Sequence, residues 1–318
     1  MKTCLLALLS AFLLSLSFCK ILIPLLKKWK AGQNILSYVK EHKSKSGTPT
    51  MGGLAFISAT VLVSSLFLKS RNVGVVLSIV VALAYMCVGI LDDVLKKKHK
   101  ENLGLKAWQK FAFQTLVAIL VGAFCIKHGL TEWYLPFTKV RVNLGNWAFL
   151  LTVIIFLATV NAVNLTDGLD GLAAGVSVPF FSGLGVLVLL EGENSGYAVV
   201  SFALTGALLA YLLFNSPPAS VFMGDTGSLA LGGFASCNAV FSGNAFYIAI
   251  IGFPFVISVI SVVVQVIYYK VTGGKRIFLM SPIHHHFQQK GYSETKIAYA
   301  YSTVSLFIAL ACILALIW

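Results

Sequence analysis

The sequence predicts an all-α integral membrane protein, in which ten transmembrane helices form a single domain over residues 1–318. Apolar residues make up 58% of the chain and charged residues only 11%, and the mean hydropathy is +0.88. Many apolar runs approach the roughly 20 residues that a helix needs to cross a bilayer. These runs are continuous rather than alternating, which favours helices over the strands of a membrane barrel.

The predicted spans follow one another along the whole chain, separated by polar connections. In order they are Cys4–Leu26, Gly52–Leu68, Val73–Leu91, Phe111–Ile126, Trp147–Val160, Leu172–Leu190, Tyr197–Phe214, Leu229–Phe241, Ala245–Val271 and Ala298–Trp318. The first run resembles a signal peptide, but lysines follow it directly, so we expect a retained helix. The ninth run would reach about 40 Å, more than the ~30 Å hydrocarbon core. We therefore expect it to tilt, protrude or break, with the break at Gly252-Phe253-Pro254.

The polar connections divide unevenly between the two sides of the membrane. Most of the 24 basic residues follow odd-numbered spans. The positive-inside rule makes those connections cytoplasmic and places both termini outside the cytoplasm. The net charge of +13 then reflects topology and attraction to anionic membrane lipids, and no nucleic-acid partner is expected. The six cysteines lie in or beside apolar runs without a CxxC pair, which is typical of buried free thiols.

All five aspartates of the chain follow odd-numbered spans. Asp92 and Asp93 end the third span, and their mutual repulsion requires a metal ion or a cation such as Lys96, one helical turn further on. An ordinary charged helix end is the alternative. Asp167 and Asp170, in the stretch from Asn161 to Gly171, could bind a metal, accept hydrogen bonds from a nucleoside, or simply cap the sixth span.

Three further segments on the same side carry groups suited to phosphate. Gly224–Ser228 opens the eighth span, where free backbone N–H groups favour phosphate and Asp225 could hold Mg²⁺. Gly47–Gly53, preceded by Lys45, suits a phosphate-contacting loop, although it is not a Walker A motif. His284, His285 and His286 are adjacent, so they cannot all face one way on a helix. We expect one or two of them to contact phosphate as hydrogen-bond donors or charges.

Carboxylates, lysines and histidines on one membrane face, beside lipid, indicate a Mg²⁺-dependent phosphoryl-transfer site. Several motifs together strengthen this interpretation. They are Gly47-Thr-Pro-Thr-Met-Gly-Gly53, Asp92-Asp93 with Lys96, Asn161–Gly171, Phe222-Met-Gly-Asp-Thr-Gly-Ser228 and Ser281-Pro-Ile-His-His-His-Phe287. In this order and over nearly the whole chain, they resemble the phospho-N-acetylmuramoyl-pentapeptide transferases, a branch of the polyprenyl-phosphate N-acetylhexosamine-1-phosphate transferases.

The resemblance implies a bacterial multi-pass protein of the cytoplasmic membrane, active at the cytoplasmic face and dimeric with itself. Its substrates would be UDP-N-acetylmuramoyl-pentapeptide and undecaprenyl phosphate, its products lipid I and UMP, and its cofactor Mg²⁺. Carried over by motif, the catalytic residues would be Asp92, Asp93, Asp225 and His284, with Asp225 on the metal and Asp167 as a possible further ligand. The substrate-binding residues would be Lys45, Thr50, Lys96, Asn164, Asp167, Gly168, Leu169, Asp170, Asn215, Phe222 and His285.

One position departs from the family pattern. An acidic residue usually follows His-His-His-Phe, and this chain has Gln288 there. Two other functions fit parts of the sequence: a sibling transferase that uses UDP-N-acetylglucosamine, and a secondary transporter with the acids as ion sites. A transporter predicts acids near mid-span and inverted repeats, whereas the acids lie at one face. The residues fit both direct transfer and a phosphoryl-aspartate intermediate.

Overall fold

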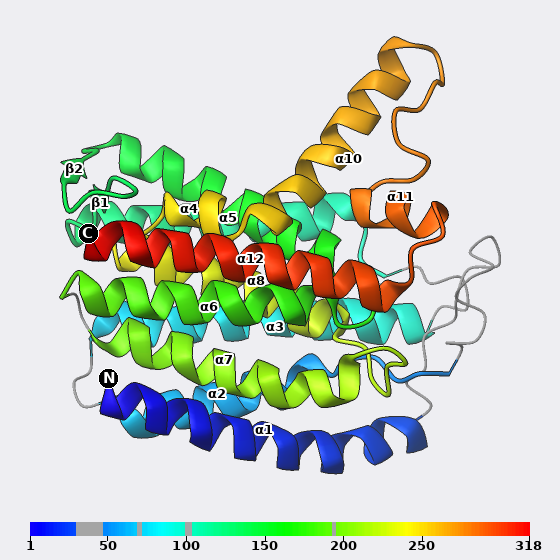
Figure 1. The fold of residues 1–318 in the computed structure, drawn as a ribbon, viewed down its shortest axis with the longest axis horizontal. Coiled ribbons are helices and arrows are strands. Elements are labelled where there is room, and N and C mark those ends of the chain that lie inside the picture. Colours follow the sequence, from blue (N-terminus) through cyan, green and yellow to red (C-terminus); the bar gives the residue numbers. More distant parts are fainter. Residues whose placement is uncertain (30–46, 69–71, 99–103, 193–194) are drawn as a thin grey trace.

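The computed structural model describes residues 1–29, 47–68, 72–98, 104–192 and 195–318, and Lys45 lies outside these ranges. Twelve helices and one short hairpin make up the described chain (Figure 1). The elements are α1 (Lys2–Lys28), α2 (Gly53–Phe67), α3 (Val73–Lys98), α4 (Ala107–Lys127), β1 (Glu132–Tyr134), β2 (Arg141–Asn143), α5 (Trp147–Thr166), α6 (Leu172–Leu190), α7 (Ser195–Asn215), α8 (Gly224–Phe241), α9 (Tyr247–Ile251), α10 (Phe253–Val271), α11 (Ile283–Gln289) and α12 (Glu294–Ile317).

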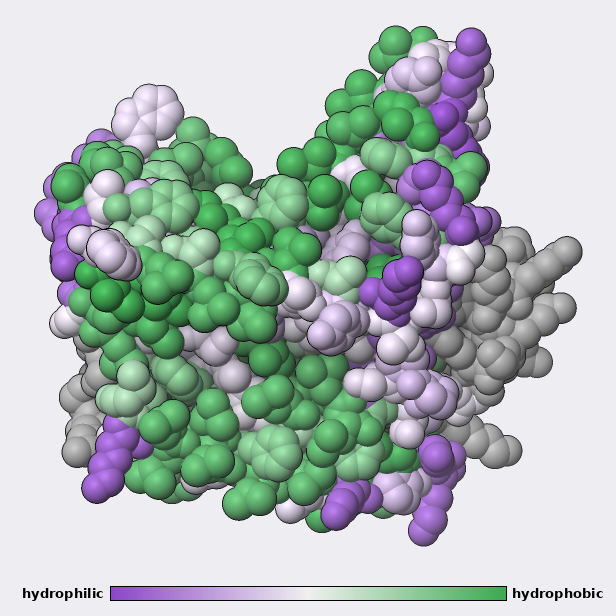
Figure 2. Space-filling model, in the orientation of Figure 1, coloured by the Kyte–Doolittle hydropathy of each residue, from purple (hydrophilic) through white to green (hydrophobic). Residues whose placement is uncertain are grey.

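Eight of the described helices are long and apolar enough to cross a membrane: α1, α3, α4, α5, α6, α7, α10 and α12. The protein is therefore a multi-pass membrane protein, as the composition predicts. Figure 2 shows the expected surface, with a broad hydrophobic band along the helices and hydrophilic residues mainly at the two ends of the bundle. Both chain ends lie at the same end of the bundle (Figure 1), as an even number of crossings requires.

α8 lies at the centre of the bundle, and the helices packed around it bury almost all of its side chains. All its residues from Thr226 to Phe241 are buried, and it packs against α2, α3 and α5. Small residues make this close packing possible, as is usual between membrane helices. A Cβ on Gly232 would lie 2.6 Å from the Cα of Val160 in α5, and one on Gly89 would lie 2.2 Å from the carbonyl oxygen of Asp225. The first turn of α8 therefore packs directly against the backbone of α3.

Alanine at Gly53 is expected to destabilise the protein by about 1–3 kcal/mol, the usual cost of overpacking. A Cβ on Gly53 would lie 2.2 Å from the Cα of Gly227, so α2 and α8 would have to separate. The thermal unfolding midpoint measures this loss. The matched control is Ala123→Leu, which adds bulk to an exposed position of α4 and should leave the midpoint unchanged. An unchanged midpoint in the Gly53 variant would contradict the close α2–α8 contact.

Helix boundaries differ from the sequence prediction where polar residues continue a helix. α3 runs on to Lys98 and α5 to Thr166, so Asp92, Asp93 and Asn164 lie on helices rather than in loops. These side chains gain tertiary partners, which remove the cost of placing polar groups near a span end. The structure also forms two elements that the sequence analysis does not predict, the β1–β2 hairpin and α11.

The predicted break in the ninth span is confirmed. α9 ends at Ile251, and α10 begins after Gly252 with Pro254 in its first turn, where the missing proline N–H costs nothing. Beyond this break α10 leans away from the bundle (Figure 1). The chain then returns through residues 272–282 to α11, which lies at the end of the bundle opposite the two termini. The break therefore lets the histidine segment reach the same end as the aspartates.

Candidate active site

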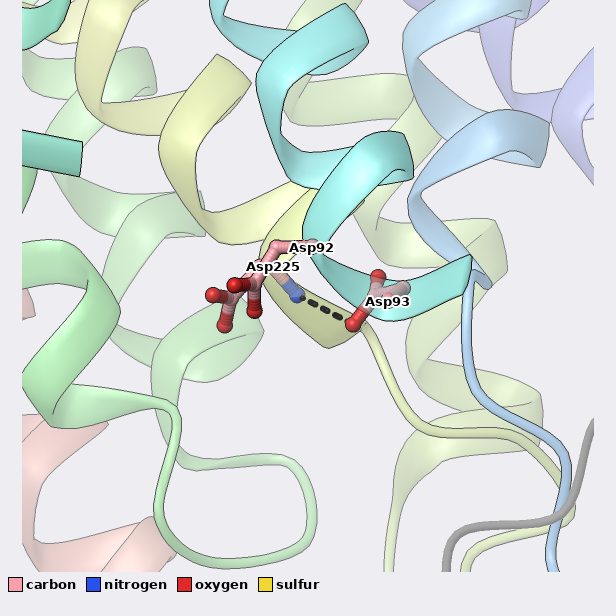
Figure 3. A group of neighbouring side chains, drawn as sticks. All are labelled: Asp92, Asp93 and Asp225. Carbon is pink, nitrogen blue, oxygen red and sulfur yellow. Dashed lines mark hydrogen bonds between the residues drawn. The ribbon is translucent and has the colours of Figure 1, made fainter. Parts of the chain in front are cut away.

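Three aspartates meet at the end of the bundle opposite the termini. Asp92 and Asp93 belong to the last turns of α3, and Asp225 belongs to the first turn of α8 (Figure 3). One carboxylate oxygen from each lies within 4.8 Å of the others. Asp92 and Asp93 are buried, and the Asp225 side chain is 13% exposed. Two residues predicted as one pair thus form a cluster with a third that is 132 positions away.

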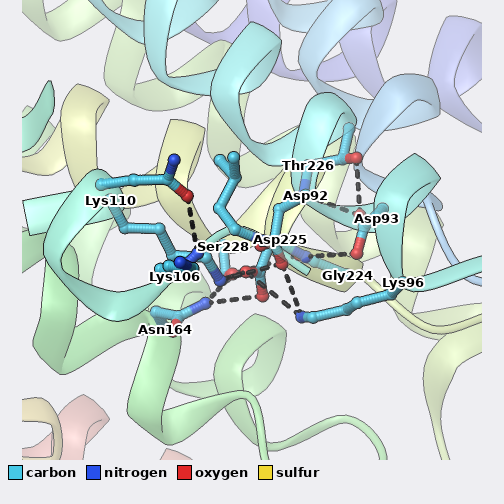
Figure 4. A network of polar contacts seen from close by, with 12 residues as sticks. Asp92, Asp93, Lys96, Lys106, Lys110, Asn164, Gly224, Asp225, Thr226 and Ser228 are labelled. Atoms are coloured by element: carbon cyan, nitrogen blue, oxygen red, sulfur yellow. Dashed lines mark hydrogen bonds and ion pairs between the residues drawn. The ribbon is translucent and has the colours of Figure 1, made fainter. Parts of the chain in front are cut away.

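Two lysines compensate this negative charge from different helices. The Lys96 Nζ lies 2.7 Å from Asp92 and 3.3 Å from Asp225. Lys110, in the first turns of α4, lies 2.8 Å from Asp92 and also bonds Asp225 (Figure 4). Each lysine therefore bridges the same two carboxylates. Because buried charges are tolerated only when paired, these ion pairs hold both lysines beside the carboxylates.

Asp93 faces a different partner from its neighbour Asp92. Its Oδ2 accepts the Thr226 backbone N–H at 3.0 Å and the Thr226 hydroxyl at 2.7 Å, and its Oδ1 accepts the Asp225 N–H at 3.3 Å. Asp93 thus satisfies N–H groups at the start of α8 that have no partner within that helix. A catalytic role for Asp93 stays a prediction, but these contacts show that it positions Asp225.

Gly224 forms the tight turn before Asp225 that lets these groups approach one another. Its φ of +69° is in the left-handed region, and a Cβ there would lie 2.5 Å from both Asp93 Oδ2 and Thr50 Oγ1. Only glycine fits both constraints. The loop that carries Thr50 is fixed beside it by backbone hydrogen bonds, from Phe222 N–H to the Pro49 carbonyl at 2.8 Å and from Gly52 N–H to the Phe222 carbonyl at 2.9 Å. The predicted Gly47–Gly53 and Phe222–Ser228 segments are therefore one structural unit.

The Asn161–Gly171 stretch contributes to the site in two ways. Asn164 donates to Asp225 Oδ1 at 3.1 Å and to the Ser228 hydroxyl at 2.8 Å, so it belongs to the carboxylate cluster. Asp167 caps α5, and partial burial next to the carboxylates of Asp225 and Asp93 raises its pKa well above the usual range. A proton, or a hydrogen-bond donor from a bound molecule, would stabilise the Asp167 carboxyl group in these surroundings.

Other residues predicted to bind substrate brace the loops around the site. Asp170 accepts the Ala219 N–H at 3.1 Å, and Asn215 accepts the Gly171 N–H at 3.2 Å while donating to the Val221 carbonyl at 2.9 Å. Leu169 is buried in the hydrophobic core. These contacts join the α5–α6 loop to the α7–α8 loop. Their part in binding a nucleotide stays a prediction.

The three histidines of α11 point in different directions, as expected. Nε2 of His284 and of His285 would lie 2.5 and 2.9 Å from a Cβ on Gly168, so both rings cover the α5–α6 loop. His286 turns away, and its Nδ1 accepts the Leu279 N–H at 3.1 Å. His284 is fully buried, and neither ring nitrogen has a hydrogen-bond partner among the described residues. Since buried polar atoms are normally paired, the His284 ring is a candidate for binding a ligand.

Acidification is expected to destabilise the protein partly through His284. Burial, with a smaller effect of His285, lowers the pKa of His284 from 6.5 to about 3. The folded protein keeps the ring neutral while the unfolded chain protonates it, so stability is lost as pH falls below 6.5. Between pH 7 and 5 the loss is about 2 kcal/mol.

The pH dependence is measured by comparing unfolding midpoints at the two pH values. The drop on acidification should be smaller in His284→Asn than in the wild type. His128→Asn, which changes an exposed histidine just after α4, should keep the wild-type drop. Equal drops in all three proteins would show that His284 does not carry this effect.

Some residues of the site could not be predicted from the sequence alone. Lys110 stands out only as one of many basic residues before a span, and its position there was the available signal. Ser228 and Thr226 lie in a recognised motif, but their partners come from α5 and α3. No local pattern marks Glu294, which contacts both the α5–α6 loop and α11.

The fold and the site define a class, that of multi-pass membrane proteins with carboxylates bridged by lysines at one end of the bundle. Comparison with known proteins narrows this class. The model of glycosyl transferase family 4 matches residues 75–243, and the phospho-N-acetylmuramoyl-pentapeptide-transferase signature 1 matches residues 45–57.

Curated relatives extend the similarity over almost the entire chain. A phospho-N-acetylmuramoyl-pentapeptide-transferase from Thermoanaerobacter sp. is 44% identical over 93% of both chains. Proteins of the same name are 42% identical in Clostridium botulinum, over 99% of this chain and 97% of the relative, and 41% identical in Halalkalibacterium halodurans, over 100% and 98%. The chain therefore belongs to the phospho-N-acetylmuramoyl-pentapeptide transferases of glycosyl transferase family 4.

Proposed function

We propose that the protein transfers phospho-N-acetylmuramoyl-pentapeptide from its UDP carrier to undecaprenyl phosphate, which forms lipid I and releases UMP for peptidoglycan synthesis. The observation that carries this proposal is the cluster of Asp92, Asp225, Lys96 and Lys110 at one end of the bundle. The family assignment supports the identity of the substrates. The signature over residues 45–57 favours the muramoyl substrate over UDP-N-acetylglucosamine.

The reaction exchanges one phosphoanhydride bond for another. In the overall exchange a phosphate oxygen of the lipid becomes bonded to the β-phosphorus of the sugar nucleotide, and the bond from that phosphorus to the oxygen shared with the α-phosphate breaks. UMP leaves with that oxygen. Phosphoryl transfer of this kind depends mainly on positioning and charge stabilisation. Lys96 and Lys110 supply positive charge at the site, while Asp225, Asn164 and Ser228 hold one another in a fixed arrangement.

The donor set fits Mg²⁺, which prefers carboxylate oxygens. Asp92 and Asp225 would hold the ion, since Asp93 is committed to the start of α8. Bound there, Mg²⁺ would supply charge neutralisation for the diphosphate. Asp167 stays a possible further ligand, and it is not one of the three carboxylates that lie within 4.8 Å of one another. Binding of uridine by Asn164, Asp167, Gly168 and the residues around them stays a proposal.

The topology belongs to the same proposal. Ten crossings result if the shorter helices α2 and α8 also span the membrane, together with the eight long apolar helices. Both termini would then lie outside the cytoplasm. The site would lie at the cytoplasmic face of a bacterial cytoplasmic membrane. The many lysines near the carboxylate end support this orientation. A homodimer surrounded by membrane lipids stays a prediction.

Release of UMP from defined substrates tests the proposed function. The purified protein with undecaprenyl phosphate and Mg²⁺ should release UMP from UDP-N-acetylmuramoyl-pentapeptide and not from UDP-N-acetylglucosamine. A product that carries the pentapeptide should appear in the lipid fraction in equal amount. Release of UMP only with UDP-N-acetylglucosamine would assign the sibling reaction. Transport into liposomes without UMP release would reject a transferase altogether.

A further inference from the structure

Two amide side chains join α4 to α5 about one helical turn away from the carboxylate cluster. Asn161 of α5 donates from Nδ2 to Oε1 of Gln114 in α4 at 2.7 Å, and also to the carbonyl oxygen of Leu157 at 2.7 Å. Gln114 is only 2% exposed. A polar side chain buried within a membrane span is costly and often has a function. Neither residue is among those expected to bind substrate or metal.

The chemistry of the groups fixes the direction of this hydrogen bond. A backbone carbonyl only accepts hydrogen bonds, so the part of the Asn161 side chain that faces the Leu157 carbonyl is its NH₂ group. The second hydrogen of that NH₂ group is donated to Gln114, which accepts through its amide oxygen. Both hydrogens of the Asn161 amide are therefore used, one within α5 and one across to α4.

The same faces of α4 and α5 carry two residues of the site. Lys110 precedes Gln114 by four positions, and Asn164 follows Asn161 by three, so each pair lies on one face of its helix. Lys110 bonds Asp225, and Asn164 donates to Asp225 Oδ1 at 3.1 Å (Figure 4). The hydrogen bond between Gln114 and Asn161 therefore lies one turn from the place where both helices reach the same carboxylate.

The position of α4 depends mainly on α5. α4 packs along α5, and its contact with α3 is slight. Lys110 nevertheless reaches Asp92 of α3, at 2.8 Å. Two hydrogen bonds support this approach: the Leu105 N–H donates to Asp92 Oδ1 at 2.7 Å, and the Tyr85 hydroxyl of α3 donates to the Gln114 carbonyl at 3.4 Å. Gln114 thus contacts α3 through its backbone and α5 through its side chain.

We infer that Gln114 is a positioning residue, whose hydrogen bond to Asn161 sets the spacing of α4 and α5 at which Lys110 and Asn164 both reach Asp225. It acts through Lys110 rather than on the substrates. The inference rests on the proposed function for the reaction that this arrangement serves. The Lys110 charge matters most for the charge that develops on the phosphates in the transition state. A displaced lysine should therefore lower kcat and leave KM unchanged.

Kinetics of variants on the two helices test the hydrogen bond itself. Gln114→Met removes the acceptor and keeps the length of the side chain. Asn161→Ser removes the donor to α4, while the serine hydroxyl can still bond the Leu157 carbonyl. Each change should lower kcat for UMP release about tenfold, the value of one hydrogen bond, with KM for both substrates unchanged. The double variant should also lose about tenfold, because both changes remove the same interaction. A hundredfold loss in the double variant, or an unchanged kcat in the single ones, would overturn the inference.

A second pair of variants tests whether Gln114 acts through Lys110. In a protein that already carries Lys110→Met, the change Gln114→Met should lower kcat no further. A further tenfold loss there would show a structural role that is independent of the lysine, and would overturn the inference. Thr115→Val is the matched control, because it removes a hydroxyl that bonds only within α4, to the Phe111 carbonyl. It should keep the wild-type kcat.

The position of Lys110 can also be measured without substrate, on the full-length protein in lipid nanodiscs. In NMR of nitrogen-labelled lysine, the Lys110 Nζ signal is assigned by its loss in Lys110→Met. It should shift in Gln114→Met and in Asn161→Ser, because Nζ moves relative to the two carboxylates that it bridges, and it should not shift in Thr115→Val. An unshifted signal in Gln114→Met would overturn the inference, and Asn161→Ser gives the same test if Gln114→Met does not fold. Failure of the wild type to release UMP would refute the proposed function and leave the NMR result standing.

Discussion

Replacing Asp225 with asparagine is expected to lower the rate of UMP release by at least about 10³-fold, the scale of losing a central charge at a transfer site. Asparagine keeps the shape of the side chain and can still meet Asn164. It removes the negative charge that Lys96 and Lys110 share with Asp92. It also removes an anionic oxygen from the set that would hold Mg²⁺. Both effects act on the reacting phosphates.

The measurement is a Mg²⁺ titration of UMP release by the variant and the wild type, with unfolding midpoints recorded for both. The matched control is Glu132→Gln, an equivalent change at an exposed acid on β1, at the opposite end of the bundle. It should leave the Mg²⁺ dependence unchanged. Normal turnover of Asp225→Asn at the usual Mg²⁺ concentration would remove Asp225 from the metal site.

Replacing Lys110 with methionine is expected to lower turnover by about 10²-fold or more, since a positioned cation is lost from a partly buried phosphate site. Methionine keeps most of the length and the apolar part of the lysine. Asp92 and Asp225 lose one of the two cations that they share, so their repulsion increases. Stability should therefore fall as well, because a buried carboxylate is left less well paired.

Lys127→Met is the matched control, because Lys127 is exposed at the other end of the same helix. Added Mg²⁺ should restore part of the lost stability of Lys110→Met, since a cation would replace the missing charge. Thermal unfolding with and without Mg²⁺ measures this recovery. Full activity of Lys110→Met would show that Lys96 alone supplies the positive charge at the site.

The carboxylates of the site could be predicted from the sequence because each lies next to a recognisable break in hydrophobicity. Asp92 and Asp93 follow an apolar run, and Asp225 lies between glycines before another. Their different roles could not be predicted. Adjacent residues on a helix point about 100° apart, so Asp92 faces the lysines while Asp93 faces the start of α8. Which face meets which neighbour depends on how α3 packs on α8.

The histidine segment shows the same division in a different form. Because the three histidines are adjacent in the sequence, they are predicted not to share one face of a helix. The structure confirms that His286 turns away from the other two. The sequence gives no reason to connect Gln288 with Glu294 or either with the α5–α6 loop. That connection arises because the break before α10 brings α11 back to the carboxylate end of the bundle, next to the first turn of α12.

The sequence by itself determined that this is a helical multi-pass membrane protein, and it predicted that the five aspartates, most of the lysines and the three adjacent histidines lie on one face. Both follow because bilayer thickness and charge asymmetry act on each segment independently. It also carried the motifs that define the family. The tertiary structure alone decided that Lys110 joins Asp92 and Asp225, that Asp93 holds the start of α8, and that Glu294 contacts Gln288. These contacts join residues far apart in the chain, and close helix packing at positions such as Gly89 and Gly224 sets their distances.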